Sequence, residues 1–161
     1  MKALITYFTM GGRTKKMAEA IASTLINYEI SYIPFEIVGK FNEKLKVLEN
    51  FNKGDFTLIE TELNKLDVVG YDLIIIGMPT HGGFPPKVFD EILTKIGNLS
   101  GKRVIAFNTA RITANKALNY MKAKIEEFGG QLIASTKFKG LFRLGVKNAT
   151  RFGTEINESQ K

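Results

Sequence analysis

The sequence predicts an α/β fold in which one doubly wound parallel sheet of five strands carries helices on both faces. Short apolar runs alternate along the 161 residues with amphipathic segments whose apolar side chains recur every three or four positions. This alternation is typical of repeated strand–helix units. The run Leu73–Ile76 is apolar throughout, as in a central parallel strand that is covered on both faces. We expect residues 1–161 to form a single domain.

The first strand–helix unit, Lys2–Ile26, organises the rest of the chain. Ala3–Phe8 predict a strand, and Thr9–Thr14 predict a loop with two glycines. A helical face follows, formed by Met17, Ala18, Ile21, Ala22, Leu25 and Ile26. The first amides of a helix lack intrahelical acceptors, and the helix dipole is positive there. The unit therefore predicts a binding site for a phosphorylated ligand.

The second predicted strand, Glu29–Val38, contains Pro34. Proline cannot donate a hydrogen bond to a neighbouring strand, so we expect this strand at an edge of the sheet. Phe41–Asn52 predict a helix, whereas residues 56–66 show no clear pattern and receive no functional residue.

The alternation continues to the end of the chain. We expect a strand at Tyr71–Gly77, a loop at 78–86, and a helix from Val88 to Ile96 that ends at Gly97. A strand at Val104–Phe107 and a loop at Asn108–Arg111 follow, and then a helix that ends at Gly129 and Gly130 and has one apolar face, formed by Leu118, Met121, Ile125 and Phe128. The last expected elements are a strand beginning at Leu132 and a short helix around Ala149, Phe152 and Ile156.

Composition excludes several classes of function. The chain has no cysteine, so disulfides, thiolate catalysis and iron–sulfur ligation are excluded. Its net charge is +7, but no basic stripe is interleaved with aromatic residues, so we expect no nucleic-acid site. The N-terminal apolar run is too short for a signal peptide or a membrane span, which makes a cytoplasmic location the expectation.

The loop Thr9–Thr14 excludes several classes of phosphate site. It lacks the Gly-Lys-Ser/Thr ending of a Walker loop and the Gly-x-Gly-x-x-Gly pattern of a dinucleotide loop. No cysteine is present to serve as a phosphatase nucleophile. Tyr7, Phe8 and Thr9 stand where a phospho-acceptor receiver domain carries acidic residues.

The remaining pattern resembles that of flavodoxins: Ser or Thr, two residues, a small residue, one residue, Thr, three residues and Ala. Thr9, Gly12, Thr14 and Ala18 fall on these positions. The segment Gly77–Thr80 is also similar to the family's flavin loop, and the resemblance covers residues 2 to about 138. It implies the flavodoxin-like strand order 2-1-3-4-5, in which the second strand is an edge.

The resemblance implies flavin mononucleotide (FMN) as a non-covalent cofactor. Its phosphate would lie in the first loop, against Thr9, Met10, Gly11, Gly12, Arg13 and Thr14. Its ring would lie between two further loops, made of Pro79, Thr80, His81, Gly82, Gly83 and Phe84 and of Asn108, Thr109, Ala110 and Arg111. Glycines at 82 and 83 allow the peptide beside the ring to turn, which would stabilise a one-electron-reduced flavin. We expect no catalytic residue and no metal site, since a single histidine makes none.

The function implied is electron transfer between redox partner proteins, without a substrate of the protein's own. Flavodoxins are commonly acidic, so a net charge of +7 implies an acidic partner or another function within the family. The alternative is an FMN-dependent NAD(P)H:quinone oxidoreductase of the same fold, and a third reading is a flavin-less binding module. The chain has no tryptophan, which leaves open the side chains that stack on the flavin. The sequence leaves open whether the protein is a monomer or a dimer.

Overall fold

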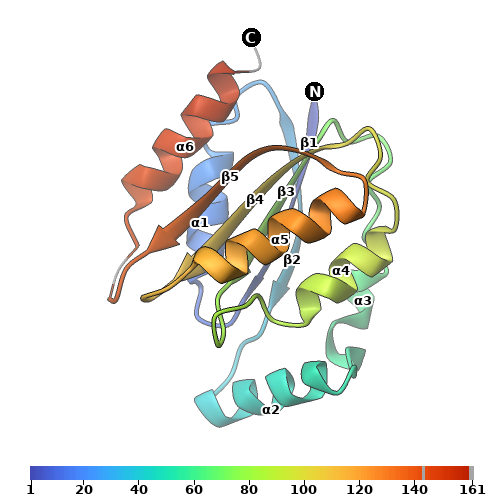
Figure 1. Ribbon diagram of the computed structural model, residues 1–161, viewed down its shortest axis with the longest axis vertical. Helices are drawn as coiled ribbons and strands as arrows, with labels where there is room; N and C mark the ends of the chain where they lie inside the picture. The colour runs from blue at the N-terminus through green and yellow to red at the C-terminus, as the bar shows by residue number, and fades with distance from the viewer. Residues whose placement is uncertain (143, 160–161) are drawn as a thin grey trace.

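The computed structural model describes residues 1–142 and 144–159. Its centre is a parallel sheet with the strand order β2-β1-β3-β4-β5 (Figure 1). The strands are β1 (Lys2–Thr9), β2 (Glu29–Glu36), β3 (Leu73–Pro79), β4 (Arg103–Ala110) and β5 (Gln131–Lys139). The doubly wound α/β class and the strand order confirm the prediction from sequence.

Six α-helices and one 3₁₀ turn lie among the described residues. They are α1 (Arg13–Ala22), α2 (Phe41–Asn52), the turn Thr57–Ile59, α3 (Glu60–Leu63), α4 (Val88–Ile96), α5 (Asn115–Glu127) and α6 (Val146–Glu158). None of the described helices has both the length and the apolar character needed to cross a membrane.

The two faces of the sheet bury separate apolar clusters. Leu4 and Phe8 of β1 pack with α2, α3, α4 and α5, whereas Ile5 and Tyr7 pack with α1 and α6. Successive side chains of a strand point to opposite faces, which is why one strand supplies both clusters. Parallel crossovers are right-handed, so α1, which leads outward to β2, lies on the opposite face from the helices that lead to β3, β4 and β5.

The edge position of β2 is confirmed. Pro34 lies in this strand opposite Tyr7, and β2 pairs only with β1 within the described sheet. The predicted helix Phe41–Asn52 has those bounds, and Gly97 ends α4 in the left-handed region at φ 74°.

Several boundaries predicted from sequence were wrong. β4 continues to Ala110, so Asn108, Thr109 and Ala110 lie in a strand and not in a loop, because pairing with β3 and β5 extends past the apolar run. α1 ends at Ala22, which leaves Ile26 outside the helix and 80% exposed. The Ser23 and Thr24 hydroxyls donate to carbonyls three residues back, a local alternative to continued helix. The last helix has 13 residues where a short one was expected.

Gly77 is required by the packing of an aromatic ring between β3 and β4. It lies opposite Phe107 in the register, and a Cβ at position 77 would lie 2.2 Å from Cζ of that ring. Phe107 is completely buried, so the ring has little room to move. This close approach fixes the packing of β3 against β4 near the carboxyl ends of the two strands.

Gly77→Ala is expected to lower the free energy of unfolding by about 1–3 kcal/mol, because the added methyl overpacks the core against Phe107. Urea unfolding of both proteins measures the difference. Gly11→Ala is the control, since a Cβ there meets nothing within 4 Å. We expect the control to change stability by less than about 0.5 kcal/mol. Equal stability of Gly77→Ala and the parent protein would contradict the account.

Candidate functional site

The carboxyl ends of β1, β3 and β4 border a cavity of about 890 Å³. The winding of the chain reverses between β1 and β3, so the crossover helices diverge there and leave a crevice at the edge of the sheet. The volume falls within the range of small-molecule sites. The cavity is lined by residues 9–11, 13–14, 79–83 and 109–113, together with Phe41, Lys44, Leu45 and Leu48 of α2.

The N-terminus of α1 forms one end of the cavity. Gly12 is its N-cap at φ 74°, with no side-chain cap, and the first turn of the helix has no acidic residue. A Cβ on Gly11 or Gly12 would meet nothing within 4 Å, so the backbone there borders open space. Uncapped amides at a positive helix end are suited to bind an anion such as phosphate.

Side chains of this first loop tie it to the ends of β4 and β5. The buried hydroxyls of Thr14 and Thr109 are hydrogen-bonded at 3.0 Å. The Arg13 guanidinium donates to the carbonyls of Ala110, at 3.3 Å, and Gly140. Burial, with a smaller effect from Arg111, lowers the pKa of Arg13 below its ordinary value. The first and third loops therefore form one hydrogen-bonded unit.

The second loop is a tight hairpin at the opposite wall. His81 and Phe84 exchange backbone hydrogen bonds of 2.8 and 3.0 Å around Gly82 and Gly83, whose φ angles are 57° and 90°. Two successive positive φ angles are typical of a type I′ turn, for which glycine is favoured. Burial lowers the pKa of His81 below its usual 6.5, which disfavours the charged form of the imidazole. The hairpin therefore presents a glycine peptide and an imidazole with a lowered pKa to the cavity.

Asn108 supports the second and third loops from behind. Its side chain is completely buried, and its amide donates to Thr80 Oγ1 at 2.6 Å and to the Ala114 carbonyl at 3.4 Å. Its Oδ1 is buried without a hydrogen-bond partner among the described residues. The Thr80 amide also donates to the Thr109 carbonyl at 2.8 Å. These contacts fix the distance between the two loops.

The structure brings together most of the residues that the sequence predicted for a site. All of them line the cavity except Gly12, Phe84 and Asn108. Phe84 instead lies edge-on to the ring of Tyr120, at 6.0 Å between centroids, and borders a separate groove. The roles of the predicted residues in binding a flavin stay predictions.

Sequence reasoning missed the contribution of α2. The sequence predicted a helix at Phe41–Asn52 but assigned it no site residue, and only Phe51 of this helix is buried. Figure 1 shows α2 at one end of the molecule, away from the middle of the sheet. Its side chains Phe41 and Leu45 line the cavity while they remain 77% and 44% exposed. The polar residues of the same helix, such as Asn42, Lys46 and Glu49, give the same amphipathic pattern whether the apolar side of the helix packs on a core or lines a cavity.

The charge of the cavity lining is entirely positive. Arg13, Lys44 and Arg111 line it, and none of its described lining residues is acidic. The described residues also contain no cluster of three or more His, Cys, Asp or Glu that could hold a metal ion. The arrangement is suited to an organic anion with an apolar part, which the apolar side chains of α2 and Ile112 can contact.

A carboxylate just outside the cavity joins β1, β2 and α1. The Tyr7 hydroxyl donates to Glu36 Oε1 at 2.7 Å, and Lys15 Nζ lies 3.1 Å from the same oxygen. The hydrogen bond from Tyr7 and then the contacts with Lys15 lower the pKa of Glu36 below its ordinary 4.5. A carboxylate with a lowered pKa stabilises the folded state above its ordinary pKa, and this contribution is lost as the pH falls through the folded value.

Glu36→Gln is therefore expected to reduce stability most at neutral pH. The difference in free energy of unfolding between parent and variant should shrink as the pH falls below about 4.5. Urea unfolding at a series of pH values measures it, with the exposed Glu49→Gln on α2 as the control. A difference that is independent of pH would show that Glu36 does not act through its charge.

The structure is similar to solved flavodoxins and flavoproteins. Oxidised flavodoxin 2 from Bacillus cereus is 22% identical, with a TM-score of 0.67 and 99% of each chain covered. A flavoprotein from Lactobacillus acidophilus NCFM, solved in complex with FMN, is 23% identical, with a TM-score of 0.61 over 84% of this chain and 92% of that one. A WrbA-like flavodoxin from Agrobacterium tumefaciens is 16% identical, with a TM-score of 0.60 over 98% of this chain and 96% of that one.

No protein-family model matches the sequence, and the search of curated proteins found no match. At these identities the likeness to solved structures shows the fold. The chain has the flavodoxin-like fold that its first loop and its alternating elements indicate.

Proposed function

We propose that this protein binds FMN non-covalently in the cavity and acts as an electron carrier between redox proteins. One observation carries the proposal. The cavity at the reversal of winding combines an uncapped helix N-terminus, a cationic lining and an apolar wall, and each suits a different part of FMN. The likeness to flavodoxins, including one flavoprotein solved with FMN, adds support.

The residues present fit the two ends of the cofactor. Gly11, Gly12 and the first amides of α1 would hold the phosphate, and Lys44 adds positive charge to the cavity. Phe41 and Leu45 would cover the ring, whose apolar surface they would shield from water. FMN supplies the redox chemistry, since its ring accepts and releases electrons one or two at a time.

Hydrogen bonds of other side chains would hold the loops in place around the cofactor. Arg13 and the Thr14–Thr109 pair hold the first loop against β4, and Asn108 holds the second loop against the third. The glycine turn at 82–83 allows either orientation of its central peptide, so it can present a carbonyl or an amide to the ring. Turning this peptide would let the protein accept a hydrogen bond from the flavin or donate one to it as the charge of the flavin changes.

A second candidate is an FMN-dependent NAD(P)H:quinone oxidoreductase. A groove of about 540 Å³ adjoins the cavity and shares Gly82, Gly83 and Ile112 with it. It could hold a second small molecule beside the ring. The carrier remains our first proposal, with the chain working as one domain in the cytoplasm.

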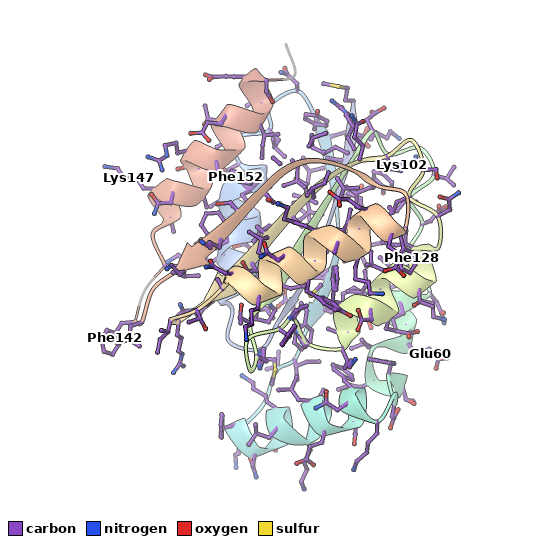
Figure 2. All side chains as sticks on the ribbon, viewed as in Figure 1. Glu60, Lys102, Phe128, Phe142, Lys147 and Phe152 are labelled. Carbon is purple, nitrogen blue, oxygen red and sulfur yellow. The ribbon has the colours of Figure 1, made fainter. Side chains whose placement is uncertain are left out.

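We propose that the partner protein is acidic. The loops that follow β4 and β5 expose Ile112 and Phe142, which are 73% and 89% exposed. Figure 2 shows Phe142 projecting at the end of β5, with Lys147 on the neighbouring α6. No Asp or Glu occurs between residues 128 and 154. An apolar tip within a basic surface is complementary to an acidic docking face.

Gly11→Asp is expected to weaken FMN binding about tenfold or more, because it adds a carboxylate where the phosphate would lie. Fluorescence titration with FMN and with riboflavin measures the effect, and Gly11→Asn is the uncharged control of the same shape. Riboflavin has no phosphate, so its affinity should change by less than about twofold. Equal losses for both flavins would contradict the placement of the phosphate.

An assay of the FMN-loaded protein separates the two candidate functions. A carrier is expected to oxidise NADH or NADPH in the presence of a quinone no faster than the same concentration of free FMN. Sustained oxidation that saturates with quinone would instead favour the oxidoreductase. Failure to bind FMN at micromolar concentrations would reject both and favour a flavin-less binding module.

A further inference from the structure

We propose that the cavity binds fully reduced FMN more tightly than oxidised FMN, and so raises the flavin's midpoint potential above that of free FMN. The inference rests on the proposed binding of FMN and concerns the balance between its two redox forms. It follows from the charges that line the cavity. A carrier of this kind accepts electrons from donors that are too weak to reduce free FMN.

The three cations of the cavity are not neutralised by acidic side chains. Within the described residues, Arg13, Lys44 and Arg111 form no ion pair. Arg13 donates to the carbonyls of Ala110 and Gly140, and Lys44 Nζ donates to the carbonyl of Met10. Carbonyl acceptors orient a cation but leave its net charge in place. Arg111 is close enough to Arg13 to lower the pKa of that guanidinium, so two like charges lie near one another in the lining.

Three carboxylates near this end of the molecule, Glu36, Glu43 and Asp90, do not line the cavity and have other contacts. Glu36 is bound by Tyr7 and Lys15. Glu43 Oε2 accepts a hydrogen bond from the Lys40 amide at 2.7 Å. Asp90, in the groove that Phe84 borders, accepts a hydrogen bond from the Tyr120 hydroxyl at 2.7 Å and lies 3.7 Å from Lys87.

Only the ring distinguishes the two redox forms electrostatically. The phosphate carries the same charge in both, so its attraction to the helix N-terminus cancels from the comparison. Reduction adds two electrons and one proton to the oxidised ring, which leaves one additional negative charge on the flavin. A cationic site interacts more favourably with that form, and a ligand shifts an equilibrium only by such a difference in affinity. Burial lowers the pKa of His81, which disfavours a positive charge on its imidazole.

The test is a spectroelectrochemical titration of the FMN-loaded protein, with free FMN in the same cell as the reference. We expect reduced FMN to bind about tenfold more tightly than oxidised FMN, which corresponds to a rise of about 30 mV for a two-electron couple. Added salt should reduce the rise, because Lys44 and Arg111 are reached by solvent and their charges are screened. An unshifted or lowered potential would overturn the inference.

Two substitutions assign the effect to the cavity. Arg111→Gln and Lys44→Gln should each reduce the preference for reduced FMN about threefold, the scale of one solvated charge. Lys46→Gln, an exposed position of α2 outside the cavity lining, removes the same charge and should leave the preference unchanged. Equal effects of Lys46→Gln would overturn the inference and point to net charge alone. Failure to bind either form of FMN would instead reject the proposed function, so the two failures are distinguishable.

Discussion

The handedness of the crossovers is the constraint on which the site depends. The chain moves outward from β1 to β2 and then returns past β1 to β3, so right-handed connections place α1 on one face and α2 to α5 on the other. At the boundary between these two directions the crossover helices diverge and leave a crevice at the carboxyl edge of the sheet. The loops after β1, β3 and β4 therefore meet around open space, and their polar groups can face a ligand. Thr14, Thr109 and Arg13 then hold these loops at a fixed separation.

The position of α2 adds apolar side chains and a positive charge to the cavity, which the strand order alone does not require. The helix is anchored to the core through Phe51, whereas Phe41 and Leu45 remain largely in contact with water. Exposed apolar side chains beside a cavity gain about 1–2 kcal/mol each when a ligand covers them. The same helix supplies Lys44, which reaches the first loop. One element thus contributes an apolar cover and a positive charge, and the cavity suits a molecule that is both aromatic and anionic.

The fold could be predicted from the sequence because its signals are local and mutually consistent. Pro34 indicated an edge strand, the apolar run at Leu73–Ile76 indicated a central one, and Gly97 ended its helix as expected. Strand ends were harder to predict, since Asn108 and Thr109 are polar and join β4 only through pairing with neighbours. The wall formed by α2 could not be predicted, because a helical apolar stripe looks the same whether it covers a sheet or a cavity. The contact of Phe84 with Tyr120 gave no local signal either, because it is made across 36 positions of the chain.

Chemical-shift mapping of FMN binding tests the central claim most directly. If one ligand occupies the cavity, titration of isotope-labelled protein with FMN should shift the backbone amides of residues 9–15, 80–83 and 109–113 together, along with those at the start of α2. The three loops should follow a single binding curve. Shifts confined to another face of the molecule, or an unchanged spectrum at saturating FMN, would contradict the account.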